Sequence, residues 1–262
     1  MNKLFVVKIG GNIVDDDIAL NLFLKDFATI NANKILVHGG GKIASKLGEK
    51  LGIIANYVHG RRITDAATLE VVTMVYGGLI NKKIVALLQG LQCNAIGLTG
   101  ADANIIKAVK RPVKQIDYGF VGDISSQSVQ VNVLSALVAE KMIPIIAPLT
   151  HDGSGQILNT NADTIAACLA VSLSTLFDIR LIYCFEKNGI LKSIEDENSV
   201  IDVLTKSTYQ QLLSENKLFA GILPKIENAF AAIDSGVQEV VIGHAKHILK
   251  NTTNITVGTL IK

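Results

Sequence analysis

Residues 35–46 read ILVHGGGKIASK: an apolar run, three glycines in succession, then a lysine and a segment of helical periodicity. Glycine adds no side chain to the packing, so three of them between a strand and a helix indicate a backbone that must stay bare. A similar turn, KIGGN (8–12), closes the first apolar run of the chain. Bare N–H groups at a helix start attract anions, so the two turns predict a phosphate or carboxylate site.

Outward from these turns, short apolar runs alternate with helical segments. This pattern predicts an α/β fold, a three-layer αβα sandwich around a mostly parallel open sheet. The polar, turn-rich stretch 106–130 breaks the rhythm and is predicted to form one or two hairpins set on the sheet. A boundary is expected near residue 175, giving lobes 1–175 and 176–262 on one continuous sheet, because no Pro/Gly/Ser-rich linker separates them. The expected strands are 4–10, 34–40, 94–100, 143–149, 180–186, 239–244 and 255–261, and the expected helices are 17–31, 42–52, 65–91, 132–141, 161–175, 205–215 and 224–235.

The composition is that of a globular chain with balanced charge. The 262 residues are 49% hydrophobic and carry a net charge of +2, with no basic tract, which argues against nucleic acid as the main partner. Cys93, Cys168 and Cys184 show no metal-ligand spacing and are expected to be reduced and buried. The N-terminus lacks a secretory leader, and no apolar stretch approaches the roughly 20 residues that cross a membrane. We therefore expect a soluble cytoplasmic protein with no membrane partner.

Neither glycine turn matches a standard nucleotide motif. A Walker A loop would need glycine at position 36 and Ser or Thr at position 43, where this chain has Leu36 and Ile43. The G-x-G-x-x-G fingerprint does not fit either, because its last position is Ala44 and no acidic residue follows at the right distance. The glycines are therefore interpreted as the functional part of the second turn, and Lys42 as a surface helix residue.

Lysine and arginine occur at positions where a fold alone does not require them. Lys8 lies inside the first apolar strand, which is costly unless its ammonium reaches an anion; the alternative is an edge-strand lysine that points to solvent. In GRRITD (60–65), Arg61 and Arg62 precede a helix, and a guanidinium there can bind a carboxylate through two hydrogen bonds. Only one of the two is expected to be functional.

Two further segments combine polar groups with a helix start. In LNTNAD (158–163), Asn159, Asn161 and Asp163 cluster before a helix, and Asn161 or Asp163 alternatively caps that helix. In ILPKIENA (222–229), Lys225 opens a helix and is either a cationic ligand for an anion or a solvated first-turn lysine.

Taken together, the motifs resemble the amino acid kinase family from end to end. The resemblance rests on KIGGN, VHGGGK, HGRRITD, MVYGGLINKKIVALL, LTGAD, LNTNAD, NGIL and ILPKIENA, which follow in the family's order. HGRRITD and NKKIVAL distinguish the chain from carbamate kinases, uridylate kinases and aspartokinases. They point to the members that phosphorylate N-acetyl-L-glutamate.

The resemblance implies transfer of the γ-phosphoryl group of ATP to the γ-carboxylate of N-acetyl-L-glutamate, the second step of arginine biosynthesis. Mg²⁺ would be held mostly by the nucleotide phosphates, with no metal site of the protein's own. The first lobe would bind the acyl amino acid and dimerise, and the second would bind ATP. The alternatives are the same chemistry on N-succinyl-L-glutamate or an aminoadipate derivative, or a non-catalytic amino-acid or nucleotide sensor. A carboxylate acceptor needs no general base, so His38 is expected to be structural.

The resemblance also assigns roles residue by residue. Lys8 and Lys225 would contact the phosphoryl group in flight, with Asp163 orienting both. The acceptor would be held by Gly40, Gly41, Arg62 and Asn159. The nucleotide would be held by Gly10, Gly11, Glu186, Lys187, Gly189 and Lys217. The sequence departs from the family at CFEKNGIL, where Glu186 and Lys187 stand in place of the usual aspartate, so the adenine and ribose contacts differ from those of relatives.

Arginine-inhibited members of the family carry an N-terminal helix that builds hexamers. Here the first strand begins near residue 4. The resemblance therefore predicts a homodimer, formed through the helical region 65–91, without arginine inhibition.

Overall fold

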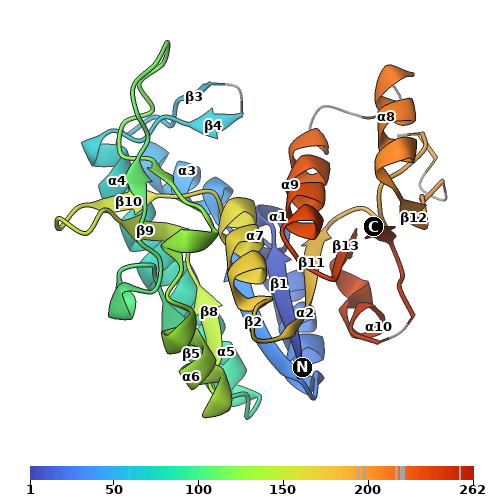
Figure 1. Ribbon diagram of the computed structural model, residues 1–262. Helices are drawn as coiled ribbons and strands as arrows, with labels where there is room; N and C mark the ends of the chain where they lie inside the picture. The colour runs from blue at the N-terminus through green and yellow to red at the C-terminus, as the bar shows by residue number, and fades with distance from the viewer. Residues whose placement is uncertain (59, 194, 197–198, 216–217, 219–221, 254) are drawn as a thin grey trace.

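In the part of the chain that the structure describes, an eight-stranded sheet runs through the whole molecule with helices on both faces (Figure 1). The computed structural model describes residues 1–58, 60–193, 195–196, 199–215, 218, 222–253 and 255–262. The strands of this sheet are β1 (Lys3–Ile9), β2 (Asn33–His38), β5 (Ala95–Leu98), β8 (Ile143–Ile146), β11 (Asp178–Phe185), β12 (Val203–Leu204), β13 (Glu239–His244) and β14 (Thr259–Ile261).

The order of these strands is β12-β14-β13-β11-β1-β2-β8-β5. All neighbouring pairs are parallel except β13 and β14. The predicted α/β fold with a mostly parallel sheet is therefore confirmed. The strand predicted over 255–261 is shorter, Thr259–Ile261, and antiparallel to its neighbour, and β12 was not predicted because two residues carry no periodic signal.

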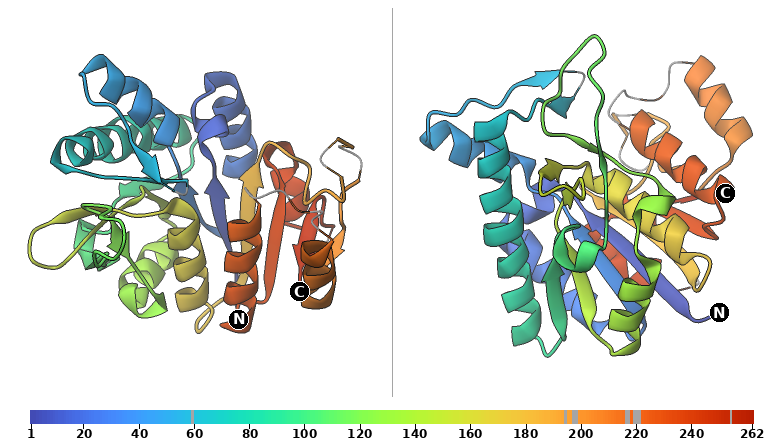
Figure 2. Two further views of the ribbon diagram at one scale, coloured as in Figure 1. Left: turned by 90° about the horizontal axis from the view of Figure 1, so that it is seen from above. Right: turned by 60° about the vertical axis from the view of Figure 1, so that its left-hand side comes forward.

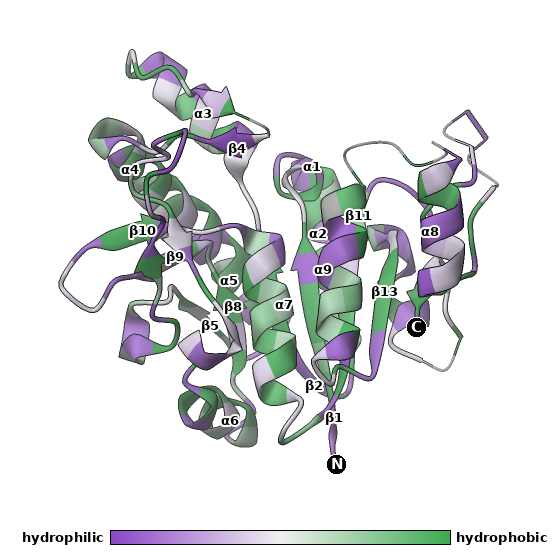
Figure 3. Cartoon of the chain, turned by 45° about the horizontal axis from the view of Figure 1, so that its top comes forward, coloured by the Kyte–Doolittle hydropathy of each residue, from purple (hydrophilic) through white to green (hydrophobic). Residues whose placement is uncertain are grey.

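Helices cover the two faces in separate groups (Figure 2, left). Successive residues of β1 point to opposite faces, so Leu4 and Val6 join one hydrophobic cluster while Phe5 and Val7 join the other. The strands and the inward faces of the helices are coloured mainly hydrophobic in Figure 3. The first cluster contains α6 (Val131–Ala139), α7 (Ala162–Leu173) and α9 (Leu223–Asp234), and the second contains α2 (Asp17–Thr29), α3 (Gly41–Lys50), α4 (Ala66–Val72), the π-helix η1 (Thr73–Ile80) and α5 (Asn81–Gly90). The remaining helical elements are α1 (Gly11–Val14), η2 (Asp102–Asn104), η3 (Ser126–Ser128), α8 (Lys206–Ser214), η4 (Ala245–His247) and α10 (Ile248–Asn251).

The elements α4, η1 and α5 form one continuous helix, Ala66–Gly90. Contrary to expectation, this helix is long and apolar enough to cross a membrane by length and composition. Its inner side chains, including Val72, Ile84 and Leu88, are fully buried in the second cluster. Core helices of this kind meet the same criterion, so the helix belongs to the packing of the sheet.

Within the described residues, three small hairpins stand apart from the central sheet. The segment predicted as hairpins, 106–130, contains one of them, β6 (Val109–Lys110) with β7 (Gly122–Asp123), as a sheet of its own. The other two were not predicted. They are β3 (Tyr57–Val58) with β4 (Arg61–Arg62), and β9 (Leu149–His151) with β10 (Ile157–Asn159).

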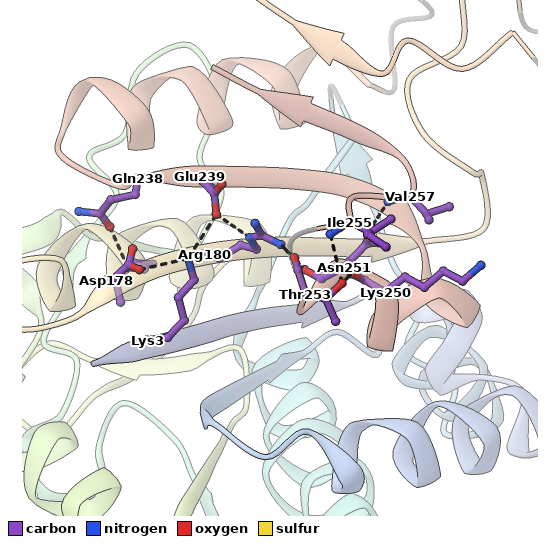
Figure 4. Close-up of polar contacts among 11 residues, drawn as sticks. Lys3, Asp178, Arg180, Gln238, Glu239, Lys250, Asn251, Thr253, Ile255 and Val257 are labelled. Atoms are coloured by element: carbon purple, nitrogen blue, oxygen red, sulfur yellow. Dashed lines mark hydrogen bonds and ion pairs between the residues drawn. The ribbon is translucent and has the colours of Figure 1, made fainter. Parts of the chain in front are cut away.

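A charged network fastens the amino-terminal ends of the sheet strands (Figure 4). Nε of Arg180 on β11 lies 2.7 Å from Oε2 of Glu239 on β13, and Nη1 of Arg180 donates to the carbonyls of Asn251 and Thr253. Nζ of Lys3 lies 3.3 Å from the same Glu239 oxygen. The network stands at the opposite end of the strands from the glycine turns, which leaves the carboxyl ends for function.

Candidate active site at the carboxyl ends of the central strands

The two glycine turns lie against each other where β1 and β2 end. The N–H of Gly39 donates to the carbonyl of Ile9 at 3.0 Å, and a Cβ on Gly39 would stand 3.5 Å from the nitrogen of Gly11. Gly10 and Gly40 occupy the N-cap positions of α1 and α3, and neither helix start has a side-chain cap. The first N–H groups of both helices are therefore left for an anion.

Gly40 is also required by packing. Its φ is +155°, and a Cβ there would come within 2.2 Å of Cδ1 of Ile80 and 3.2 Å of the ring of Tyr76. The bare backbone that the sequence indicated is therefore required here by the packing of the helix 66–90 against Gly40.

Lys8 and Lys225 share the carboxylate of Asp163. Nζ of Lys8 lies 2.6 Å from Oδ1, and Nζ of Lys225 lies 2.6 Å from Oδ2. The three residues come from β1, from the first turn of α7 and from the first turn of α9. Lys8 is only 8% exposed, and β1 lies between β11 and β2, which excludes an edge-strand lysine. The cap of α7 is Asn161, whose Oδ1 accepts from the N–H of Thr164, so the Asp163 carboxylate is left for the lysines.

The charges of this triad are strongly coupled. Burial opposes ionisation of Asp163, but the two ammonium groups outweigh it and hold the pKa of this carboxyl well below its ordinary value. Burial lowers the pKa of Lys8; the attraction of Asp163 opposes this shift and the like charge of Lys225 adds to it. Such perturbed groups at the end of a parallel sheet are typical of a site that handles a further charge.

On the other side of the glycine turns, Arg62 reaches the start of α3. Its Nη2 donates to the carbonyl of Gly41 at 2.8 Å and to Oγ of Ser45 at 2.9 Å, and it also contacts the hydroxyl of Tyr57. The structure thus brings together Arg62 and Gly41, two residues that the sequence analysis expects at the acceptor. Asn159 belongs to the same region, because its Nδ2 donates to Oγ1 of Thr64 at 3.0 Å.

The residues expected at the nucleotide follow β11. Glu186, Lys187 and Gly189 form the bend after this strand, beside the carboxyl end of β1. A Cβ on Gly189 would stand 2.8 Å from Oγ1 of Thr259 and 2.7 Å from Cγ1 of Val200, so this glycine is fixed by packing. Lys217 lies outside the described residues.

His38 is fully buried and makes structural hydrogen bonds. Its Nδ1 lies 2.8 Å from the carbonyl of Gly39, and the side-chain amide of Asn81 lies 3.2 Å from Nε2. Burial lowers the pKa of His38 to about 4, so the ring is neutral at physiological pH. Among the described residues, no group of three or more His, Cys, Asp or Glu side chains could hold a metal ion.

A sequence model of the Amino acid kinase family matches residues 3–244. The chain belongs to the amino acid kinase family. An acetylglutamate kinase of Cytophaga hutchinsonii is 54% identical over 261 residues, which cover 99% of this chain and 98% of that protein. An acetylglutamate kinase of Bacteroides thetaiotaomicron is 53% identical over 260 residues, with coverage of 99% and 98%. Kinases of this family take their phosphoryl group from ATP, so ATP is a substrate of this chain.

Solved structures share the fold at low sequence identity. N-acetylglutamate synthase from Neisseria gonorrhoeae, complexed with coenzyme A and N-acetyl-glutamate, superposes with a TM-score of 0.83 at 22% identity, covering 99% of this chain and 59% of that one. Carbamate kinase from Giardia lamblia, bound to AMP-PNP, gives a TM-score of 0.67 at 12% identity, with coverage of 99% and 98%. At these identities the likeness establishes the amino acid kinase fold alone.

The sequence analysis did not predict the surroundings of three side chains near this candidate site. Both carboxylate oxygens of Asp15, at the end of α1, are buried without a hydrogen bond to any described residue, and burial raises the pKa of Asp15. The buried hydroxyl of Tyr183 donates to the backbone carbonyl of Asp163 at 3.2 Å and anchors the start of α7. Lys42, expected to be a plain surface residue, is exposed but donates to Oδ1 of Asn12 and joins the two glycine turns. The contacts of Tyr183 and Lys42 join distant segments, so neighbouring sequence carries no signal for them.

Proposed function

We propose that this chain is an acetylglutamate kinase, which transfers the γ-phosphoryl group of ATP to the γ-carboxylate of N-acetyl-L-glutamate in arginine biosynthesis. The observation that carries the proposal is the 54% identity to a protein of that name over nearly the full length of both chains. The Lys8–Asp163–Lys225 arrangement beside two uncapped glycine turns supports it, because two cations and a set of free N–H groups converge on one point.

The mechanism follows from the charges. An oxygen of the γ-carboxylate attacks the γ-phosphorus, the bond from that phosphorus to the bridging oxygen breaks, and ADP leaves with the electron pair. The carboxylate is already ionised at neutral pH, so the protein supplies no general base. Its task is to hold two anions against each other and to neutralise the charge of the transferring group. We assign this task to Lys8 and Lys225, with Asp163 keeping both ammonium groups in place.

The substrates would flank this triad. Gly40, Gly41, Arg62 and Asn159 would bind the acceptor, with the Arg62 guanidinium on its α-carboxylate. The nucleotide phosphates would meet the N–H groups of the first turn, and the bend after β11 would border the nucleoside. The proposed nucleotide residues are Gly10, Gly11, Glu186, Lys187, Gly189 and Lys217.

Mg²⁺ fits this site as an ion that would bind together with ATP. The Asp163 carboxylate is fully engaged by two lysines, and no cluster of acidic side chains stands beside it among the described residues. Oxygen ligands would therefore come from the phosphates and water. The ion would supply further charge neutralisation when bound.

The division of labour between lobes is also a proposal. Residues 1–175 would bind the acceptor and dimerise, and residues 176–262 would bind ATP, each lobe contributing four neighbouring strands of the common sheet. Met74 and Leu79 are 53% and 55% exposed on the helix Ala66–Gly90, which supports this helix as the homodimer contact. We also propose that the enzyme acts in the cytoplasm.

The test is a hydroxylamine-trapping assay with MgATP. N-Acetyl-L-glutamate and N-succinyl-L-glutamate are compared side by side, because the acyl phosphate of either reacts to a coloured hydroxamate. Product from the acetyl substrate supports the proposal. A preference for the succinyl substrate, or for an aminoadipate derivative added in parallel, would keep the mechanism and change the acceptor. No product from any acceptor, with nucleotide binding retained, would support the sensor alternative instead.

A further inference from the structure

A basic cavity lies at the rim of the molecule, outside the site described above. Its volume is about 640 Å³, and it opens between the β3–β4 hairpin and the segment 111–118, which rise side by side above the sheet (Figure 1 and Figure 2, right). The charged and aromatic side chains that line it are Arg61, Arg111, Lys114, Tyr118 and Asp123. The lining thus contains three cations and one carboxylate.

One cation is already neutralised within the cavity wall. Nε of Arg111 lies 3.0 Å and 3.2 Å from the two carboxylate oxygens of Asp123, and Nη2 lies 2.5 Å from Oδ1. The same guanidinium stacks over the ring of Tyr118 at 5.2 Å. Arg111 is therefore held rigidly, with its remaining N–H groups available at the cavity.

The other two cations have no anionic partner. The side chains of Arg61 and Lys114 form no hydrogen bond or ion pair with any residue that the structure describes. Arg61 belongs to the hairpin and Lys114 to the opposite wall, and both residues are exposed, so two uncompensated positive charges border one open cavity. Clefts lined by one sign of charge concentrate ions of the other sign.

The walls of this cavity are continuous with the acceptor side of the kinase site. Arg61 is adjacent to Arg62 in β4, and neighbouring residues of a strand point to opposite faces. Two residues further on, the N–H of Thr64 donates to the carbonyl of Tyr118 at 2.9 Å, while its hydroxyl accepts from Asn159. A change in the position of the hairpin would therefore alter both the cavity and the region around Arg62 and Asn159.

We propose that this cavity is a second anion site, which binds a small dianion bearing carboxylate or phosphate groups. The anion bridges Arg61 and Lys114, adds hydrogen bonds from Arg111, and fastens the hairpin to the segment 111–118. Because Arg62 on the same hairpin is assigned to the acceptor, a bound anion raises acceptor affinity; this second part rests on the proposed function.

The test of the site is direct binding to the full chain. Inorganic phosphate and succinate are titrated separately by calorimetry at constant ionic strength, since exposed charges are screened by salt. We expect saturable binding of at least one of them, weakened about tenfold or more in Arg61→Ala and in Lys114→Ala, which corresponds to about 1.4 kcal/mol. The control is Lys110→Ala, which removes a nearby exposed lysine that stacks on Phe120 outside the cavity lining. This control is expected to bind as the unaltered chain does.

The outcomes separate the two anion chemistries and the competing sites. Binding of phosphate alone assigns the cavity to phosphate-bearing ligands, and binding of succinate alone assigns it to dicarboxylates. Binding that both Arg61→Ala and Lys114→Ala retain, or that Arg62→Ala abolishes, would place the anion in the acceptor site and overturn the proposal. Absence of saturable binding would overturn it too.

The coupling has its own test. The affinity for N-acetyl-L-glutamate is measured with and without the anion that binds, and the anion's affinity with and without the acceptor. Linkage requires that the anion change the acceptor affinity by the same factor by which the acceptor changes the anion affinity. We expect this factor to be above one in the unaltered chain and to fall to one in Lys114→Ala. A factor of one in the unaltered chain would overturn the coupling. Since anion binding needs no turnover, failure of the site and failure of the kinase assignment are distinguishable.

Discussion

Lys8 and Lys225, 217 positions apart in the chain, bind the two oxygens of one carboxylate at the same distance of 2.6 Å. One lysine comes from each proposed lobe, and Asp163 lies between them at the start of α7. Two like charges in a partly buried place repel each other unless an anion compensates them. The arrangement therefore fixes the spacing of the cations before a substrate arrives, which is the preorganisation that charge-stabilising catalysis needs.

The first prediction concerns these two cations. Lys8→Ala and Lys225→Ala should each lower kcat by about 10²–10³, the loss found when one preorganised donor is removed. The measurement is the hydroxamate assay at saturating substrates, with circular dichroism to show that each variant is folded. Lys46→Ala, on the exposed face of α3, is the matched control and should keep its kcat. Near-full kcat in either active-site variant would contradict the assignment.

The pH dependence of the reaction should reflect the deprotonation of Lys8. Burial lowers the pKa of Lys8, so its folded-state pKa lies below the value of about 10.4 for an exposed lysine. The charged form is the one that stabilises the phosphoryl group, so kcat/KM should fall as pH rises through this lowered pKa. In Lys8→Arg the residual activity should keep its kcat/KM to higher pH, because arginine stays protonated. An alkaline limb at the same pH in both proteins would show that another group titrates.

Arg62 should act on acceptor binding. Arg62→Ala is expected to raise the KM for N-acetyl-L-glutamate about 10- to 100-fold, since a hydrogen bond to a charged group is worth about 1.5–3 kcal/mol. The KM for ATP should change little. Arg61→Ala removes the same charge from the other face of the hairpin and, without added anions, should leave both constants near their original values. If the two variants had equal effects on the acceptor KM, the assignment of Arg62 would be wrong.

Much of the fold was predictable because the sheet strands are continuous apolar runs. Lys8 could be identified as exceptional for the same reason, since a lysine within such a run needs an anion. Its partner Asp163 was indicated only by the family resemblance, because the residues by themselves leave Asn161 and Asp163 equally able to cap α7. The packing of α7 between β1 and α9 separates their roles. The β3–β4 hairpin, with two-residue strands that include Arg61 and Arg62, gives no alternation to detect.

The network in Figure 4 should matter for stability and not for catalysis. Arg180→Met leaves two backbone carbonyls without their donor and Glu239 with Lys3 alone, and should lower the free energy of unfolding by about 3 kcal/mol. Lys3→Met removes a half-exposed contact to the same carboxylate and should cost less than about 1 kcal/mol. The hydrogen bond from Arg180 lowers the pKa of Glu239, so its contribution is present above the unfolded pKa near 4.3 and is lost as pH falls through the folded pKa. Urea unfolding at pH 7 and pH 3 should therefore give a smaller difference between Arg180→Met and the unaltered chain at pH 3.

Substitutions at Gly40 and Gly52 allow two contributions to the free energy of unfolding to be separated, the strain of the backbone and a steric clash of the new Cβ. Gly40→Ala places a Cβ at φ +155° and 2.2 Å from Cδ1 of Ile80, whereas Gly52→Ala places one at φ +76° in open space. Gly52→Ala should cost about 1–2 kcal/mol for the left-handed backbone alone. Gly40→Ala should cost about 1–3 kcal/mol more from overpacking.

A further variant, Ile80→Val, deletes the Cδ1 methyl group that a Cβ on Gly40 would meet. In the double variant Gly40→Ala/Ile80→Val, the 2.2 Å clash is removed, while the backbone strain and the 3.2 Å approach to Tyr76 remain. The free energy of unfolding should therefore recover part of the way toward that of Gly52→Ala. A double-mutant cycle by urea unfolding measures this coupling directly. No recovery would mean that Gly40 is needed for its backbone conformation alone. Recovered stability without recovered kcat would instead show that the bare amide at Gly40 serves the bound acceptor as well as the fold.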